Sequence, residues 1–143
     1  MKIVFSPSSK AEFKWKETDS LDGAPVQVFS YRVDLKNSRY SVTAIPKLPV
    51  IVGFHGLAYI DDATRGVRRI TMVADGIPAR YPVRASAIAI DYDYVAINNH
   101  DYLMPVRGEM RMKLGKLEQI LNRIEFRDYH RFGSDARIVG FTP

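Results

Sequence analysis

The stretch that decides the fold runs from Ser86 to Lys113 and reads SAIAIDYDYVAINNHDYLMPVRGEMRMK. Two long segments in it alternate apolar and polar residues with a period of two, the side-chain spacing of a half-buried β-strand. In the first segment Ile88 and Ile90 share one face, while alanines and aspartates occupy the other. Asn98 lies in the turn between the segments, and asparagine tolerates the left-handed conformation of tight turns. The stretch therefore predicts one long antiparallel hairpin with a wet and a dry face.

Further strands are predicted on both sides of this hairpin. Residues 12–16 and 26–35 alternate in the same way around the turn composition Asp-Gly-Ala-Pro, which predicts a second hairpin. Residues 56–60 and 67–73 flank an aspartate-rich turn in which Gly66 is expected to supply the positive φ. Shorter strands are expected at residues 40–44 and 137–141.

The segment 114–121 fits two structures. Leu114, Leu117 and Leu121 lie at helical spacing, whereas an early glycine and the alternation through Ile124 and Phe126 favour a turn followed by a strand. We expect the turn and the strand. The complete pattern predicts a mainly β protein, either a single large curved antiparallel sheet or a half-open barrel of about eight strands, with at most one short helix.

Length and composition indicate one domain, residues 1–143, with enough chain to bury its own core. The absence of cysteine excludes disulfides, thiolate metal ligands and cysteine nucleophiles. The net charge of +5 is dispersed, with Arg68-Arg69 as the longest basic cluster, so no nucleic-acid partner is expected. The apolar run at the start of the chain is too short for the hydrophobic region of a signal peptide. The chain then represents either a protein without an export signal or the C-terminal part of a longer exported precursor.

Motifs of known enzymes do not occur in the sequence. His55, His100 and His130 are scattered without metal-site spacing, and no serine or glycine lies in a hydrolase or nucleotide-binding motif. We therefore expect no enzyme activity, no cofactor and no metal site. Asp91 and Asp93 share a face of one strand and leave a cation or acid–base site as an alternative. An ion pair with Arg107 or Arg111 across the hairpin is the favoured interpretation.

Aromatic and methionine side chains on the predicted strands are the positive signal. Core packing is their ordinary use, but a curved sheet with little helix to cover it also leaves room for an apolar ligand. The candidate ligand-binding residues are Trp15, Phe29, Tyr31, Tyr92, Tyr94, Met104, Met110 and Met112.

Nearly the whole chain resembles a family of uncharacterised exported acidobacterial proteins. The resemblance is carried by residues 5–13, 56–70, 77–84, 91–95, 102–105 and 124–129. More distantly, the strand–turn–strand pattern from Tyr59 to Ile70 resembles the sheet of periplasmic lipoprotein carriers of the LolA/LolB/RseB type. That resemblance implies an unclosed barrel that receives lipid chains, in the periplasm or cell envelope; the helices that plug such barrels are not evident in this chain.

Two functions follow as hypotheses. The first is a non-enzymatic envelope or periplasmic domain that binds a lipid or another apolar ligand on a curved sheet face. The second is a protein–protein interaction or assembly module, either a homo-oligomer or a domain with an envelope partner, which would use an exposed strand edge or sheet face.

Overall fold

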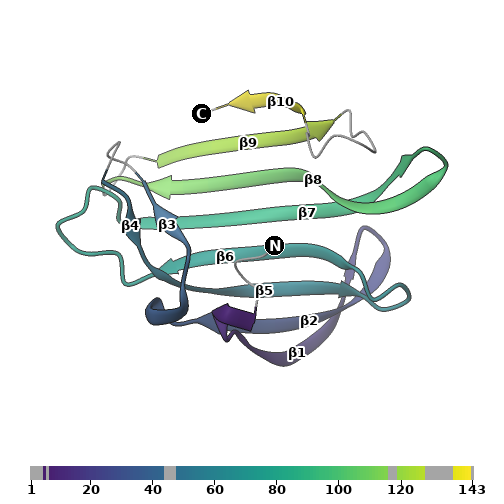
Figure 1. Cartoon of the computed structure of the whole chain (residues 1–143), viewed down its shortest axis with the longest axis horizontal. Helices are drawn as coiled ribbons and strands as arrows, with labels where there is room; N and C mark the ends of the chain where they lie inside the picture. Colours follow the sequence, from purple (N-terminus) through teal and green to yellow (C-terminus); the bar gives the residue numbers. More distant parts are fainter. Residues whose placement is uncertain (1–4, 6, 44–47, 116–118, 128–136, 143) are drawn as a thin grey trace.

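The computed structural model describes residues 5, 7–43, 48–115, 119–127 and 137–142. Among these residues there is no helix of seven or more residues, and two three-residue 3-10 turns, η1 (Pro7–Ser9) and η2 (Leu35–Asn37), stand outside the sheets. Figure 1 shows the strands, which are β1 (Glu12–Leu21), β2 (Ala24–Val33), β3 (Ser41–Val42), β4 (Val50–Ile51), β5 (Gly53–Asp61), β6 (Val67–Asp75), β7 (Ala85–Ile97), β8 (His100–Lys113), β9 (Gln119–Arg127) and β10 (Arg137–Thr142).

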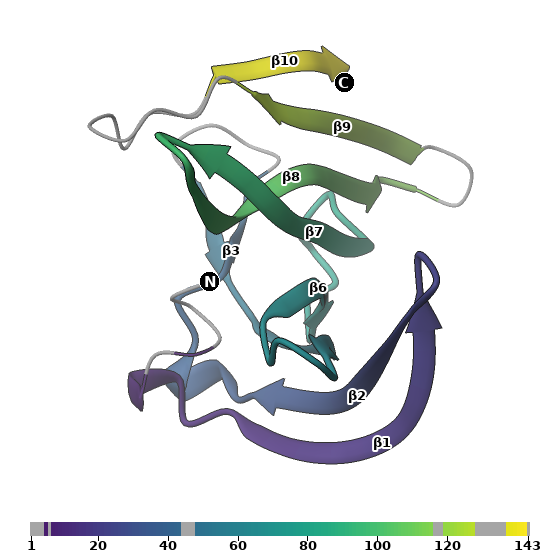
Figure 2. The ribbon, with the colours of Figure 1, turned by 90° about the vertical axis from the view of Figure 1, so that its right-hand side faces the viewer.

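Eight of these strands form one antiparallel sheet in the order β1-β2-β5-β6-β7-β8-β9-β10, and β3 pairs only with β4. The two edge strands, β1 and β10, lie at opposite ends of the molecule, so the sheet is not closed (Figure 2). This architecture confirms the predicted large curved antiparallel sheet. In the part of the chain described, no helix has the length and apolar character that crossing a bilayer would require.

Two tight turns have the chemistry that their sequence predicts. Asn98 and Asn99 join β7 to β8 with φ values of 50° and 66°, and Asp22 and Gly23 join β1 to β2 with 51° and 81°. Two consecutive residues with positive φ define the turn whose twist matches that of the flanking strands, and Asn, Asp and Gly are the residues that adopt it at least cost.

The turn between β5 and β6 corrects one prediction. Asp61 initiates it as expected, because its Oδ1 accepts hydrogen bonds from the backbone N–H groups of Ala63 and Thr64. The positive φ, however, belongs to Arg65 (64°) and not to Gly66. A Cβ at position 66 would lie 2.9 Å from both a methyl carbon of Leu103 and the hydroxyl of Tyr94, so these two side-chain ends pack directly over the glycine.

Several strand boundaries also differ from the predictions. The strand expected at 26–35 ends at Val33, and Leu35 lies exposed in η2. The strand expected at 40–44 is reduced to Ser41–Val42, with residue 44 outside the described residues. The predicted strand after residue 114 is confirmed as β9, although residue 117 lies outside the described part, and the predicted last strand is confirmed as β10.

The main core cluster lies on one face of the large sheet, which we call the apolar face. Phe54, Ala58, Ile70 and Met72 are almost completely buried there, because alternate residues of β5 and β6 point to the same side. The β3–β4 hairpin and the loop before β7 cover this part of the sheet with the side chains of Tyr40, Val42, Val52, Tyr81 and Val83. Ile88 and Met110, which the hairpin pattern places on the dry side, pack against this core.

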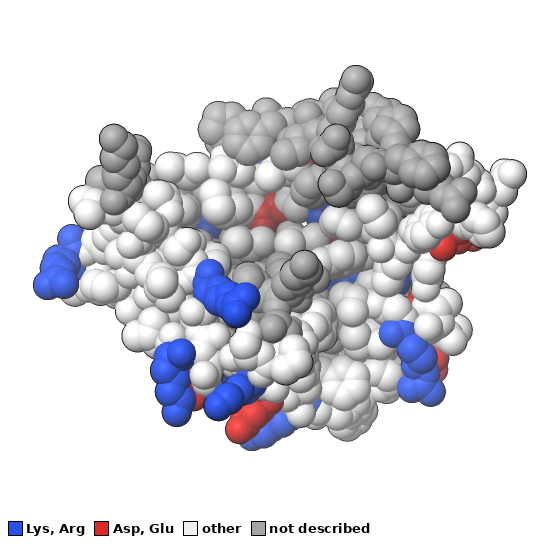
Figure 3. All heavy atoms as spheres, viewed as in Figure 1, with Lys and Arg blue, Asp and Glu red and all other residues white. Residues whose placement is uncertain are grey.

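Hydrogen bonds as well as packing hold the covering segments on the sheet. The Tyr40 hydroxyl lies 3.0 Å from Ser86 Oγ on β7, and the Tyr81 hydroxyl donates to the carbonyl oxygen of Leu48 at 2.8 Å. Burial raises the pKa of both the Tyr31 and the Tyr40 hydroxyl, so both stay protonated and able to donate at neutral pH. On the side of the molecule seen in Figure 1, Lys and Arg side chains stand apart from one another and form no stripe (Figure 3).

Candidate functional site

A hollow on the apolar face remains open beyond the cover, and we call it the apolar groove. It has a volume of about 290 Å³, and its lining residues are Phe5, Phe13, Phe29, Ala58 and Ile60. Ala58 forms a small, buried floor, while Phe5 and Phe13 stand 43% and 40% exposed. Every described residue that lines the groove is apolar, so these side chains offer contacts to hydrocarbon and no hydrogen bond.

The aromatic rings of the groove are connected to the core. The rings of Phe5 and Phe13 stack at 5.6 Å with an interplanar angle of 2°. The Phe13 ring lies 5.7 Å from that of Tyr31, which in turn lies 6.0 Å from Phe54. Phe13 and Tyr31 face each other in the register of β1 and β2, which places both rings on the apolar face. A continuous series of ring contacts therefore connects the groove to the core.

The eight candidate residues do not form one surface. Trp15 and Phe29 oppose each other on β1 and β2 beside the groove, and Trp15 is 61% exposed. The indole N–H of Trp15 donates to the side-chain oxygen of Gln27 at 2.8 Å, which fixes the ring orientation.

The other six candidates lie elsewhere. Tyr31 and Met112 are buried in the core cluster, and Met110 packs against it. These three side chains therefore pack in or against the core and do not form an open ligand surface. Tyr92, Tyr94 and Met104 lie on the half of the β7–β8 hairpin near its turn and do not line the groove.

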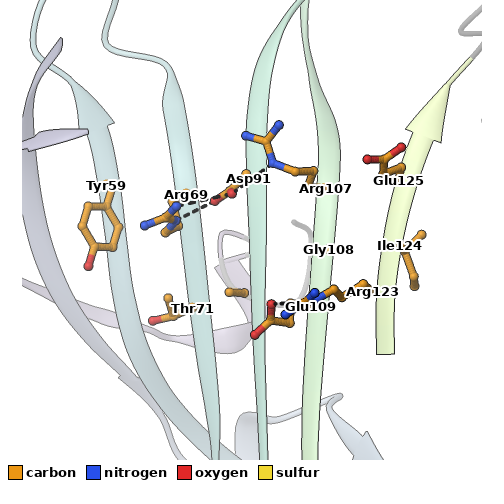
Figure 4. A pocket seen from close by; sticks show the side chains of 11 residues that line it. Tyr59, Arg69, Thr71, Asp91, Arg107, Gly108, Glu109, Arg123, Ile124 and Glu125 are labelled. Atoms are coloured by element: carbon orange, nitrogen blue, oxygen red, sulfur yellow. Dashed lines mark hydrogen bonds and ion pairs between the residues drawn. The ribbon is translucent and has the colours of Figure 1, made fainter. Parts of the chain in front are cut away.

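The opposite face of the sheet carries a second hollow, of about 480 Å³, over a series of charged side chains that we call the charge ladder. Its members are Arg69, Asp91, Arg107, Glu109, Arg111, Arg123 and Glu125. Figure 4 shows Tyr59, Arg69, Asp91, Arg107 and Glu125 in one row across five neighbouring strands. Ala89 also lines the hollow beside this row, and its small side chain leaves the hollow open.

Short contacts order the first row of the ladder. Arg69 donates to both carboxylate oxygens of Asp91, at 2.5 and 3.3 Å, and its guanidinium lies 5.7 Å from the centre of the Tyr59 ring. The hydrogen bond to Asp91 raises the pKa of Arg69. Arg107 contacts the same carboxylate through Nε at 3.6 Å. The predicted ion pair of Asp91 with Arg107 is confirmed, and Arg69 is an additional partner.

The second row repeats this arrangement around Glu109. Arg111 donates to Glu109 at 2.7 Å, and Arg123 contacts the other carboxylate oxygen at 3.5 Å. The hydrogen bond from Arg111 lowers the pKa of Glu109, so this carboxylate stays ionised in mildly acidic solution.

Asp93 differs from Asp91 in its partner. It lies 3.4 Å from Arg68 of β6 and not beside Arg107 or Arg111 as expected. Arg68 also contacts Asp61, whose pKa is lowered first by the hydrogen bond from the Thr64 backbone. No group of three or more potential ligands among the described residues could hold a metal ion.

The histidines are also placed, except His130, which lies outside the described residues. His100 begins β8 and is exposed. His55 lies within β5, with Nδ1 at 2.6 Å from Asp75, and Arg32 contacts the other oxygen of that carboxylate at 3.1 Å. The three side chains bridge β2, β5 and β6 on the same face as the charge ladder, at some distance along the strands.

Sequence reasoning missed most of the groove and most of the ladder. The alternation of Phe13 with Trp15 in the sequence could have identified Phe13 as a residue on the same face. Ala58 and Ile60, in contrast, become lining residues only because β5 pairs with β2. Arg69 meets Asp91 because β6 pairs with β7 in one particular register, which no turn sets. The chain matches no protein-family model, no curated protein and no solved structure.

Proposed function

We propose that this domain binds an apolar ligand, such as a lipid acyl chain, in the apolar groove. The observation that supports this most is an open hollow whose lining, within the described part of the chain, consists of apolar side chains, two of them phenylalanines at least 40% exposed. Exposed apolar surface of this kind is costly in water and marks interaction sites. A volume of about 290 Å³ is at the small end for ligand sites, which favours a single chain over a large ring system.

The proposed role is non-enzymatic binding on a curved sheet face. The resemblance of the sequence to exported proteins supports the periplasm or cell envelope as its location. The cover formed by the β3–β4 hairpin leaves the groove accessible, so a ligand can enter without displacement of the buried core.

Trp15 provides a direct measurement. It is the single tryptophan of the chain and lies opposite Phe29, a lining residue. Titration with fatty acids of increasing chain length should shift its fluorescence emission to shorter wavelength and saturate, because a bound chain excludes water from the indole. Saturable shifts that strengthen with chain length are the expected result, and the absence of any saturable shift would overturn the proposal.

A matched pair of variants tests the location. Phe13→Asp places a charge in the groove and should weaken fatty-acid binding by at least about tenfold, since burying an uncompensated charge is strongly unfavourable. Tyr102→Asp is the control, because Tyr102 has the same 40% exposure on β8 and does not line the groove. Equal losses in both variants would contradict binding in the groove.

A second candidate function is a protein–protein interaction module. Three large apolar side chains that are more than half exposed favour it. They are Leu35 in η2, Leu48 just before β4, and Ile51 in β4. Sedimentation of the wild type and of Leu48→Ser with Ile51→Ser tests self-association through this region. The edge of β1 is a poorer candidate, because its two lysines and the bulge between Trp15 and Glu17 are features that oppose edge pairing.

A further inference from the structure

The charge ladder contains two carboxylates that are each shared by two arginines. In both cases one arginine lies close to the carboxylate and the other lies farther away. Arg69 and Arg111 are the close partners, at 2.5 and 2.7 Å, whereas Arg107 and Arg123 contact through Nε at 3.6 and 3.5 Å. The close partners already neutralise Asp91 and Glu109. Counted with Glu125, which also lines the hollow, the ladder holds four arginines against three carboxylates and so keeps one net positive charge.

The outer arginines are neighbours above the same hollow. Arg107 on β8 opposes Glu125 on β9, and Glu109 opposes Arg123, so Arg107 and Arg123 are diagonal neighbours on one face. Diagonal side chains of adjacent strands are within reach of one another when they are long. Both side chains line the hollow of about 480 Å³, and they are 58% and 65% exposed.

We propose that this hollow binds the phosphate or carboxylate group of a small anionic ligand through Arg107 and Arg123. A guanidinium presents a planar fork of N–H donors that fits two oxygens of either group, and such charge-assisted hydrogen bonds are stronger than neutral ones. The contact to protein carboxylates engages only Nε in the measured pairs, so rotation of the outer guanidinium groups toward a ligand leaves the close pairs of Asp91 and Glu109 in place. Thr71 and Tyr59 line the same hollow and supply hydroxyl groups for the remainder of the ligand.

The test is a titration of backbone amide chemical shifts with inorganic phosphate and, separately, with acetate, at constant ionic strength and pH. Saturable shifts confined to β6–β9 around the hollow are expected with at least one probe, and the probe that binds more tightly identifies the class of oxyanion. If neither probe gives saturable shifts there, the proposal is overturned.

Variants separate specific binding from general electrostatic attraction. Arg107→Gln combined with Arg123→Gln should weaken binding of the probe by about tenfold or more. The control combines Arg39→Gln with Arg84→Gln, two exposed arginines outside the hollow that give the same change in net charge. Equal weakening in both double variants would contradict the proposal. The two hollows lie on opposite faces, so failure of this test leaves the apolar groove untouched.

Discussion

The two faces of the large sheet are built from the same strands and stabilised in different ways. On β5, Phe54 is completely buried under the cover, while the adjacent His55 lies on the opposite face and pairs with Asp75. On β6, Ile70 is completely buried, while Arg69 belongs to the charge ladder. Neighbouring residues thus experience hydrocarbon and water alternately, which shows that side-chain direction determines the energetic role of each position.

The largest expected effect comes from the apolar face. Phe54→Ala should lower the free energy of unfolding by about 3–5 kcal/mol, because it removes a fully buried ring from a packed cluster and leaves a cavity. His55→Ala, one residue away on the other face, should cost less than about 1 kcal/mol, since a polar pair that is partly exposed to solvent contributes little. Urea unfolding of both variants measures the contrast, and similar losses would show that the two faces do not differ as described.

A glycine on the apolar face gives the second effect. Gly56 opposes Tyr31, whose hydroxyl crosses it to donate to the Thr71 carbonyl oxygen at 2.6 Å. A Cβ at this position would lie 1.9 Å from that backbone oxygen, so Gly56→Ala should destabilise the protein by about 2–3 kcal/mol. Gly115→Ala is the control, because its Cβ would meet no atom of the described residues within 4 Å, and it should leave the unfolding midpoint in urea nearly unchanged.

The smallest effect is expected on the charged face, and it depends on pH. The pKa of Glu109 is lowered in the folded protein, chiefly by the hydrogen bond from Arg111. Its stabilising contribution is therefore complete above the ordinary glutamate pKa and is lost as the pH falls through the lowered value. Glu109→Gln should be less stable than the wild type at pH 7, and the difference should be smaller at pH 3, below the ordinary glutamate pKa.

A matched glutamate checks this third prediction. Glu17 on β1 forms no ion pair with any residue in the described ranges, so Glu17→Gln should change stability little at either pH. Urea unfolding at both pH values measures the two variants. A pH-independent loss in Glu109→Gln would show that packing, and not the charge, is responsible.

Much of the fold was predictable because hairpins are local. The alternation in the stretch from residue 86 to 113 and the two asparagines between its strands predicted β7, β8 and their turn. The turn alone would have placed Asp91 opposite Val106; a shift of register between Asp91 and Tyr92, which the sequence did not predict, places it opposite Arg107. The site was less predictable. Of the candidate ligand residues only Phe29 lines the apolar groove, since an aromatic residue on a strand looks the same in sequence whether it is covered or open.

The sequence by itself determined the β class, the individual hairpins and which residues of a strand share a face, since these depend on the period-two geometry and on turn residues. Only the tertiary structure decided that β2 pairs with β5 across the intervening β3–β4 hairpin, and which part of the apolar face that hairpin covers. Such pairings join segments without a shared turn, so they are selected by the total apolar surface that the folded chain buries. The open groove and the four-arginine ladder are consequences of that selection.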